Sequence, residues 1–334
     1  MHARQLLTLV AAVAASATLV PPLSAQAPAA QAPQVTVGGV VYTQYQYTDA
    51  AVHTNTFDVT RAYVNVLGRF SGGITTRVTA DIIPSAVTNQ QFRLKYAFAA
   101  WTPTGSSLTY KLGMMQTPFV DYEEALWDYR MQGTIAVDRN GAMTSSDIGV
   151  GVDGKWNNDQ VNSQIAIVNG EGYSGGTGDF HKDLEARVSV RLKPTNDASR
   201  VGGLRVTGYA GVGKYGPAFA GNDRNRFLGQ VSYRTQQFTV AGEYVSRKDS
   251  TQTGSILSAF GVYHLTGGKV AVIGRVDLVD PDKNVANNKN TRIIGGASYQ
   301  LSANVRLLAD LDRLSFESGA TATNQVLFQA QFVF

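Results

Sequence analysis

The feature that most constrains this chain is an alternation of apolar and polar residues that recurs along its length. Between 268 and 279, for example, Val272 and Val276 alternate with Arg275 and Asp277. A period of two places such residues on opposite faces of a β-strand, so the pattern predicts strands with one apolar and one polar face. From residue 34 to residue 334 no apolar run reaches 18 residues, and only one stretch has a helical composition.

Segments of this kind number sixteen along the chain. An even number of consecutive strands with this alternation is typical of an antiparallel, up-and-down sheet. We therefore expect an all-β, sixteen-stranded antiparallel fold. The predicted strands span 34–47, 56–70, 73–83, 91–102, 107–116, 147–156, 160–169, 183–193, 202–214, 225–235, 237–247, 255–264, 268–279, 291–301, 304–316 and 324–334.

The predicted connections alternate in length. Short ones such as 71–72 and 302–303 alternate with long ones such as 117–146, 170–182 and 248–254. This layout is typical of a barrel in the bacterial outer membrane. Because hydrocarbon offers no hydrogen bonds to the backbone, a spanning sheet must close on itself. The apolar faces would then meet lipid, and the polar faces would surround a water-filled bore.

The composition excludes several other classes of protein. The 334 residues include no cysteine, 16% charged residues and a net charge of +4. These values exclude a disulfide-stapled domain, a thiolate metal site, a coiled coil and a disordered chain. No block of five like charges occurs, so we expect no nucleic-acid partner.

The first residues predict export. An apolar stretch follows Arg4, and the small-x-small sequence at 25–27 has the form of a cleavage site. We interpret 1–27 as a secretory signal peptide, 28–33 as a flexible lead-in and 34–334 as the transmembrane barrel. The expected location is the bacterial outer membrane, reached through the periplasm.

The last predicted strand carries a further signal. Its apolar residues alternate with glutamines up to Phe334. Such a strand would be an aggregation hazard at an exposed sheet edge, but it suits the strand that closes a barrel. Phe332 and Phe334 resemble the insertion signal of bacterial outer-membrane barrels. Other aromatic residues near strand ends suit girdles at the membrane interfaces, and these are Tyr42, Phe57, Phe70, Trp101, Trp156, Tyr233, Phe238, Tyr263 and Tyr299.

Two segments resemble a known family. The residues at 61–70, RAYVNVLGRF, resemble the second strand of the phosphate-selective porin O/P family. The residues at 113–119, GMMQTPF, with the following Glu123-Glu124, Arg139 and 148–152, are similar to that family's strand, Thr-Pro-Phe turn and next strand. The resemblance implies a trimeric outer-membrane diffusion channel with a loop folded into its bore. The family's arginine ladder and lysine cluster have no match here, so the chain is identified as similar to a general porin.

The long connection that starts at 117 has the position expected for the loop that folds into the bore. It begins with Pro118 and carries the helix-compatible stretch 121–129. We expect a short helix inside the bore, with acidic side chains that form one wall of a constriction. The predicted constriction residues are Asp121, Glu123, Glu124, Asp128 and Arg130.

Basic residues on the polar faces of other strands would form the opposite wall. Opposed acidic and basic walls create a transverse field that screens solutes by size and charge. We expect a channel for small hydrophilic solutes with a weak preference for anions, phosphate-type anions included. The alternative that the arginines only pair with Asp81 and its neighbours stays open. The predicted pore-lining residues are Arg61, Arg69, Arg77, Asp81, Arg93, Lys95, Lys111, Arg187 and Arg191.

Two other functions stay open at this point. An outer-membrane barrel enzyme would need a nucleophile beside a histidine at a rim, but His53 and His181 fall in loops and His264 lies ~20 Å along a strand from Ser258. A soluble secreted all-β binding protein would need two buried faces. We expect no catalytic residue, metal or cofactor, because no histidine and carboxylate cluster has ligand spacing. The expected partners are outer-membrane lipid, small solutes or anions, and two further copies of the chain.

Overall fold

The structure is a computed structural model that describes residues 32–85, 89–175, 179–216, 221–265 and 267–334. The predicted signal peptide lies outside the described residues. Of the predicted lead-in, only the last two residues are described, and they precede the first strand without belonging to it.

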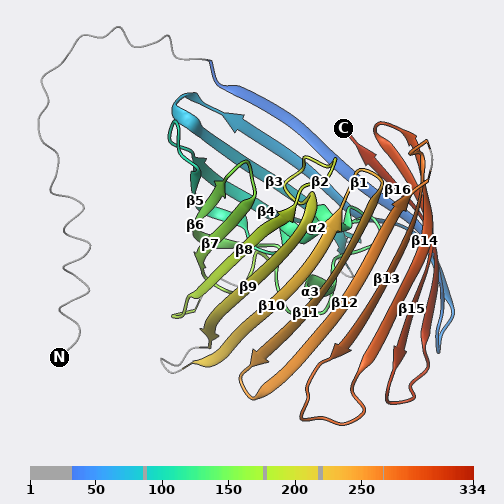
Figure 1. Cartoon of the computed structure of the whole chain (residues 1–334). Helices are drawn as coiled ribbons and strands as arrows, with labels where there is room; N and C mark the ends of the chain where they lie inside the picture. Colours follow the sequence, from blue (N-terminus) through green and yellow to red (C-terminus); the bar gives the residue numbers. More distant parts are fainter. Residues whose placement is uncertain (1–31, 86–88, 176–178, 217–220, 266) are drawn as a thin grey trace, which may run out of the picture. The chain divides into compact units, whose positions relative to one another are not determined.

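Within the described residues, sixteen strands form a closed barrel in which each strand is antiparallel to its neighbours and β16 pairs with β1 (Figure 1). Each strand end lies within three residues of its predicted position. The predicted sixteen-stranded antiparallel barrel is confirmed. The strands are β1 (Gln34–Asp49), β2 (Thr54–Arg69), β3 (Ile74–Ser85), β4 (Asn89–Trp101), β5 (Leu108–Gln116), β6 (Ser146–Trp156), β7 (Val161–Val168), β8 (Asp183–Lys193), β9 (Gly203–Tyr215), β10 (Asn222–Arg234), β11 (Phe238–Asp249), β12 (Gln252–His264), β13 (Val270–Asp280), β14 (Asn290–Ser302), β15 (Val305–Phe316) and β16 (Thr323–Val333).

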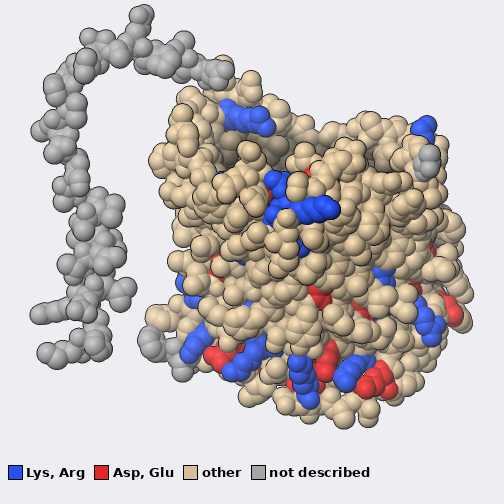
Figure 2. Space-filling view, in the orientation of Figure 1, with Lys and Arg blue, Asp and Glu red and all other residues tan. Residues whose placement is uncertain are grey.

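The barrel is apolar outside and polar inside, the reverse of a soluble core. In β13, Val272, Val276 and Leu278 are 40 to 44% exposed on the outer face, whereas Arg275 and Asp277 on the inner face are 3% and 1% exposed. Figure 2 shows the charged side chains gathered along the lower rim, below an outer wall that carries few of them. Such a wall suits hydrocarbon outside and water inside.

The connections alternate less regularly than predicted. At one rim, 117–145 and 169–182 are long, as expected. At the same rim, β11 and β12 are joined by only two residues, 250–251, because both strands extend farther than predicted. At the opposite rim, nine residues at 194–202 join β8 to β9, and the 3-10 helix η1 (Ser71–Gly73) joins β2 to β3.

Two helices lie inside the barrel, in the connection between β5 and β6 (Figure 1): α2 (Val120–Trp127) and α3 (Ala136–Arg139). The helix-compatible stretch predicts α2. It does not predict α3, because four residues are too few to show a helical period. No helix of the described residues is long and apolar enough to cross a membrane.

One strand differs from its predicted faces. The alternation in 91–102 predicts that Tyr96 and Phe98 face away from Lys95. In the structure, the pairing of β4 with β3 shifts by one residue at Lys95. This β-bulge reverses the faces of the second half of the strand. As a result Tyr96 is 4% exposed, and both rings face the interior together with Lys95.

The seam between β1 and β16 depends on a glycine. Gly39 exchanges backbone hydrogen bonds of 2.8 and 3.0 Å with Phe334. A Cβ on Gly39 would lie 2.4 Å from the Phe334 ring and 2.3 Å from the Tyr63 carbonyl oxygen. Phe332 and Phe334 are 42% and 62% exposed. A side chain at residue 39 therefore cannot be accommodated without displacing the Phe334 ring or the Tyr63 backbone of β2.

We expect Gly39→Val to weaken the seam, because overpacking of this kind costs about 1–3 kcal/mol. The temperature at which the compact band converts to the unfolded band on a heat-modifiability gel should fall. Gly295→Val is the matched control, since a Cβ on this β14 glycine would meet nothing within 4 Å. Equal losses in both variants would contradict the role assigned to Gly39.

Candidate functional site

The loop at 117–145 packs on the inner wall of the barrel. Phe119, Tyr122 and Trp127 are at most 1% exposed. The ring of Trp127 meets that of Phe260 in β12 edge-on, with 5.2 Å between centroids. An apolar cluster thus forms between loop and wall inside an otherwise polar barrel. The cluster fixes the loop against one side of the bore.

Arginines also hold the backbone of this loop. Loop carbonyl oxygens lack strand partners, so each one needs another donor. A guanidinium group suits this role because it stays charged and carries five N–H donors. In the part of the chain that the structure describes, seven arginines donate to loop carbonyls over 2.6 to 3.1 Å: Arg187 to Pro118, Arg200 to Asp121, Arg234 to Ala125, Arg306 to Asp128, Arg275 to Thr134, Arg247 to Asn140 and Arg226 to Ala142.

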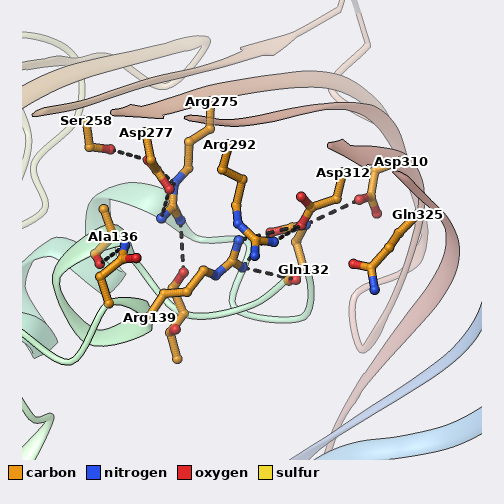
Figure 3. A network of polar contacts seen from close by, with 12 residues as sticks. Gln132, Ala136, Arg139, Ser258, Arg275, Asp277, Arg292, Asp310, Asp312 and Gln325 are labelled. Atoms are coloured by element: carbon orange, nitrogen blue, oxygen red, sulfur yellow. Dashed lines mark hydrogen bonds and ion pairs between the residues drawn. The ribbon is translucent and has the colours of Figure 1, made fainter. Parts of the chain in front are cut away.

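A charged network fixes the second half of the loop (Figure 3). Arg275 and Asp277 form an ion pair of 2.7 Å in which both side chains are 1% exposed. Asp312 pairs with Arg292 at 2.7 Å and with Arg139 of α3 at 3.6 Å. Because opposite charges alternate here, the network holds the loop in position without creating a strongly charged wall.

A cavity of about 310 Å³ lies between α2 and the wall formed by β1 to β4, and we call it the passage. It brings acidic residues of the loop opposite basic residues of the wall. Its lining residues are Val40, Tyr42, Tyr63, Asn65, Arg77, Thr79, Lys95, Tyr96, Asp121, Glu124, Ala125, Asp128, Arg130, Arg200 and Gln331.

The cations of the wall are held by neutral groups. Lys95 Nζ lies 3.2 Å from the Tyr63 hydroxyl and 4.7 Å from the centre of its ring. The Arg77 guanidinium donates to Asn65 Oδ1 at 2.9 Å and lies 4.4 Å from the centre of the Tyr96 ring. Neither cation forms an ion pair with a carboxylate of the described residues. Both positive charges therefore face the passage without a carboxylate bound to them.

The three loop carboxylates that line the passage, by contrast, are each paired with an arginine. Such pairing offsets most of the field that a carboxylate would exert on a solute. The pairs are Asp121 with Arg200 at 2.7 Å, Glu124 with Arg130 at 3.0 Å and Asp128 with Arg306 at 3.4 Å.

Asp81 takes up two of the predicted pore-lining arginines. Its side chain is 0% exposed and pairs with Arg61 at 2.8 Å and with Arg93 at 2.9 Å. Arg93 also donates to the Tyr173 hydroxyl at 2.7 Å, so the loop at 169–182 reaches the same cluster. For Arg61 and Arg93, pairing with Asp81 is what the structure shows.

The remaining predicted residues lie away from the passage. Glu123 is 1% exposed and faces Glu243 of the wall. Each of the others has its own surroundings: Lys111 pairs with Asp153 at 2.5 Å, Arg187 is 6% exposed beneath the loop, Arg191 donates to the Asn158 carbonyl at 2.7 Å, and Arg69 is exposed at the end of β2.

The sequence reasoning missed the aromatic lining of the passage. Tyr42, which we predict in an interfacial girdle, is 7% exposed and faces inward. Its position could have been found, because Tyr42 shares the period-two face of Gln44. Tyr63 likewise shares a face with Arg61. Tyr96 could not have been found, because the bulge at Lys95 leaves no mark in the alternation.

The described residues place no group of three or more histidine, aspartate or glutamate side chains where they could hold a metal ion. His53 lies in the β1–β2 connection and pairs with Asp49 at 3.0 Å, while His264 ends β12.

Comparison with known proteins identifies related chains. A family model described as Gram-negative porin matches residues 8–319. No curated protein sequence matches the chain. Solved structures that share its fold include the anion-selective porin from Comamonas acidovorans (14% identity, TM-score 0.68, 90% of this chain and 100% of that chain), Salmonella typhi OmpF in complex with daunomycin (14%, 0.67, 89% and 97%), and the trimer form of in-vitro folded OmpT, an outer membrane protein of Vibrio cholerae (12%, 0.62, 90% and 99%).

Burial, reinforced by the nearby Glu243 carboxylate, raises the pKa of Glu123 well above its usual value. The protonated carboxyl therefore stabilises the loop below its usual pKa, and this contribution is lost as the pH rises through the raised pKa. We expect Glu123→Gln, which mimics the protonated form, to raise the melting temperature at pH 8 by the few degrees that ~1 kcal/mol produces. The gain should shrink at pH 4. Tryptophan fluorescence melts in detergent measure it, because Trp127 of α2 is buried between the loop and the barrel wall.

Glu124→Gln is the control, one residue along the same helix. It removes the ion pair with Arg130 and should give no such gain. A gain that is the same in both variants, or that does not depend on pH, would show that the Glu123 carboxyl is not protonated at its buried position.

Proposed function

This chain belongs to the Gram-negative porin family and is an outer-membrane channel protein, and we propose that it passes small hydrophilic solutes with a preference for anions. The family and the fold are those of a channel rather than of an enzyme or a soluble binding protein. The proposal concerns the solutes and the sign of the charge that the passage favours.

One observation carries the proposal: the passage has two cations that form no ion pair with a carboxylate of the described residues. Arg77 and Lys95 are held by tyrosine rings and neutral polar groups, whereas the three loop carboxylates that line the passage are each bound to an arginine. In a narrow bore with low-dielectric walls, such fixed charges attract ions of opposite sign. The cluster of Arg61 and Arg93 around Asp81 adds one further positive charge nearby.

A neighbour in fold supports this direction. The porin from Comamonas acidovorans, which is described as anion-selective, shares the fold of this chain at 14% identity. The proposal does not extend to a specific preference for phosphate, because the two free cations do not form the lysine cluster and arginine ladder of the phosphate-selective family.

The preference can be measured as a reversal potential across a KCl gradient in planar bilayers. We expect the wild-type channel to favour chloride, and Arg77→Glu and Lys95→Glu each to shift the reversal potential toward cations, because each reverses a charge in the passage. Lys289→Glu changes the charge equally, in the exposed β13–β14 connection. It should shift the reversal potential little, since salt screens exposed charges beyond ~10 Å at 0.1 M. A cation-selective wild type refutes the proposal.

We also propose that three copies of the chain assemble in the membrane. The trimer form of OmpT from Vibrio cholerae, which shares this fold, supports the assembly, and the apolar outer wall could contact a neighbouring barrel. Light scattering coupled to size-exclusion chromatography in detergent should give three times the protein mass of one chain. A protein mass equal to that of one chain across the concentration range would refute the trimer.

A further inference from the structure

The passage is lined by aromatic rings as well as by charges. Tyr42, Tyr63 and Tyr96 form part of its wall, and Val40 and Ala125 add apolar surface. Small inorganic ions gain nothing from apolar walls. Sites for organic ligands, in contrast, combine apolar and aromatic lining with a few placed polar groups. The lining therefore indicates a solute that has both a charge and an apolar body.

We propose that the passage binds flat aromatic monocarboxylates of about the size of benzoate in preference to acetate and to inorganic anions. This inference rests on the anion preference proposed above and specifies the class of anion. The carboxylate would accept hydrogen bonds from Lys95 and Arg77, and the ring would lie against Tyr42 and Ala125.

The positions of the two cations support this arrangement. Lys95 lies 4.7 Å from the centre of the Tyr63 ring, and Arg77 lies 4.4 Å from that of Tyr96. A carboxylate that binds either cation by a charge-assisted hydrogen bond thus places the rest of its molecule beside an aromatic ring. The Tyr42 ring meets the Tyr63 ring edge-on, 6.4 Å away. Edge-to-face and offset contacts of this kind are those that a further aromatic ring prefers.

The size of the passage suits a solute with one ring. Its volume of about 310 Å³ equals that of roughly ten water molecules at ~30 Å³ each. One six-membered ring with a carboxylate and a few water molecules fits this space.

The opposite wall favours a single negative charge. Asp121, Glu124 and Asp128 line that side, and the Asp128 side chain is 52% exposed even though it contacts Arg306. A second carboxylate on the far side of the ring would find no cation free to bind it there, because Arg200, Arg130 and Arg306 are each paired with one of these carboxylates. A monocarboxylate needs no second cation, because its uncharged end faces the loop.

The test is block of the chloride current through the purified channel in a planar bilayer. Benzoate, cyclohexanecarboxylate, acetate, phosphate and benzyl alcohol are each added, and the concentration that halves the conductance is recorded. We expect benzoate to act at a concentration about tenfold lower than acetate, which corresponds to ~1.4 kcal/mol. Cyclohexanecarboxylate should need a higher concentration than benzoate, because it lacks the flat ring. Benzyl alcohol, which lacks the charge, should not block.

Two tyrosines of β1 provide a matched pair of variants. Tyr42→Leu removes the ring beside the passage and should raise the half-blocking concentration of benzoate to that of acetate. Tyr45→Leu changes a partly buried tyrosine on the outward face of the same strand, and benzoate should block this variant as it blocks the wild type.

The outcomes separate this inference from the function on which it rests. A wild-type channel that favours chloride but is blocked equally by benzoate and acetate, or more strongly by phosphate, overturns the inference and leaves the anion preference in place. A cation-selective reversal potential overturns both. Block by benzoate that is unchanged in Tyr42→Leu shows that the ring does not lie where we place it, and also overturns the inference.

Discussion

A peptide group in hydrocarbon finds no water to bond with, and this chain meets that constraint by joining β16 to β1, so that no strand keeps a free edge. The inverted distribution of side chains follows from the same closure. Once the sheet is a ring, one face of every strand must meet lipid and the other must meet water. Arg275 and Asp277 are therefore inside, where soluble proteins keep their apolar residues, and Val272 and Val276 are outside.

Closure creates a bore, and the loop at 117–145 determines its form. The loop carries backbone that no strand can pair, and arginines supply the missing donors, as Arg187 does for Pro118 and Arg306 for Asp128. The same residue type thus serves two separate purposes in this barrel. Most arginines hold the loop or the wall in position, because they are paired with backbone carbonyls or carboxylates. Only the few that are held by neutral side chains, such as Arg77, leave their positive charge to act on solutes.

The alternation of residues was sufficient to predict the strands and the closed barrel, and the helix-compatible composition of 121–129 was sufficient to predict α2, because these features depend on local patterns and on the backbone. Neither pattern predicts which charged side chains pair with each other. Asp81 lies between Arg61 and Arg93 because of the register between β2, β3 and β4, and register is not visible in one strand alone. The single extra residue at Lys95 reverses the face of Tyr96. The sequence could therefore place Arg77 and Lys95 on a polar wall but could not tell which cations of that wall would be neutralised.

The seam between β1 and β16 has a consequence for how the protein assembles. The two strands come from opposite ends of the barrel segment, so this pairing has the largest sequence separation in the fold, and contacts of that kind form slowly. Until the last strand arrives, β1 presents an unpaired edge of exposed backbone groups, which is the kind of edge that recruits other chains. The unpaired edge must therefore be covered while the chain is in water. Aggregation through this edge is avoided only if the chain is released when both β1 and β16 are available to pair.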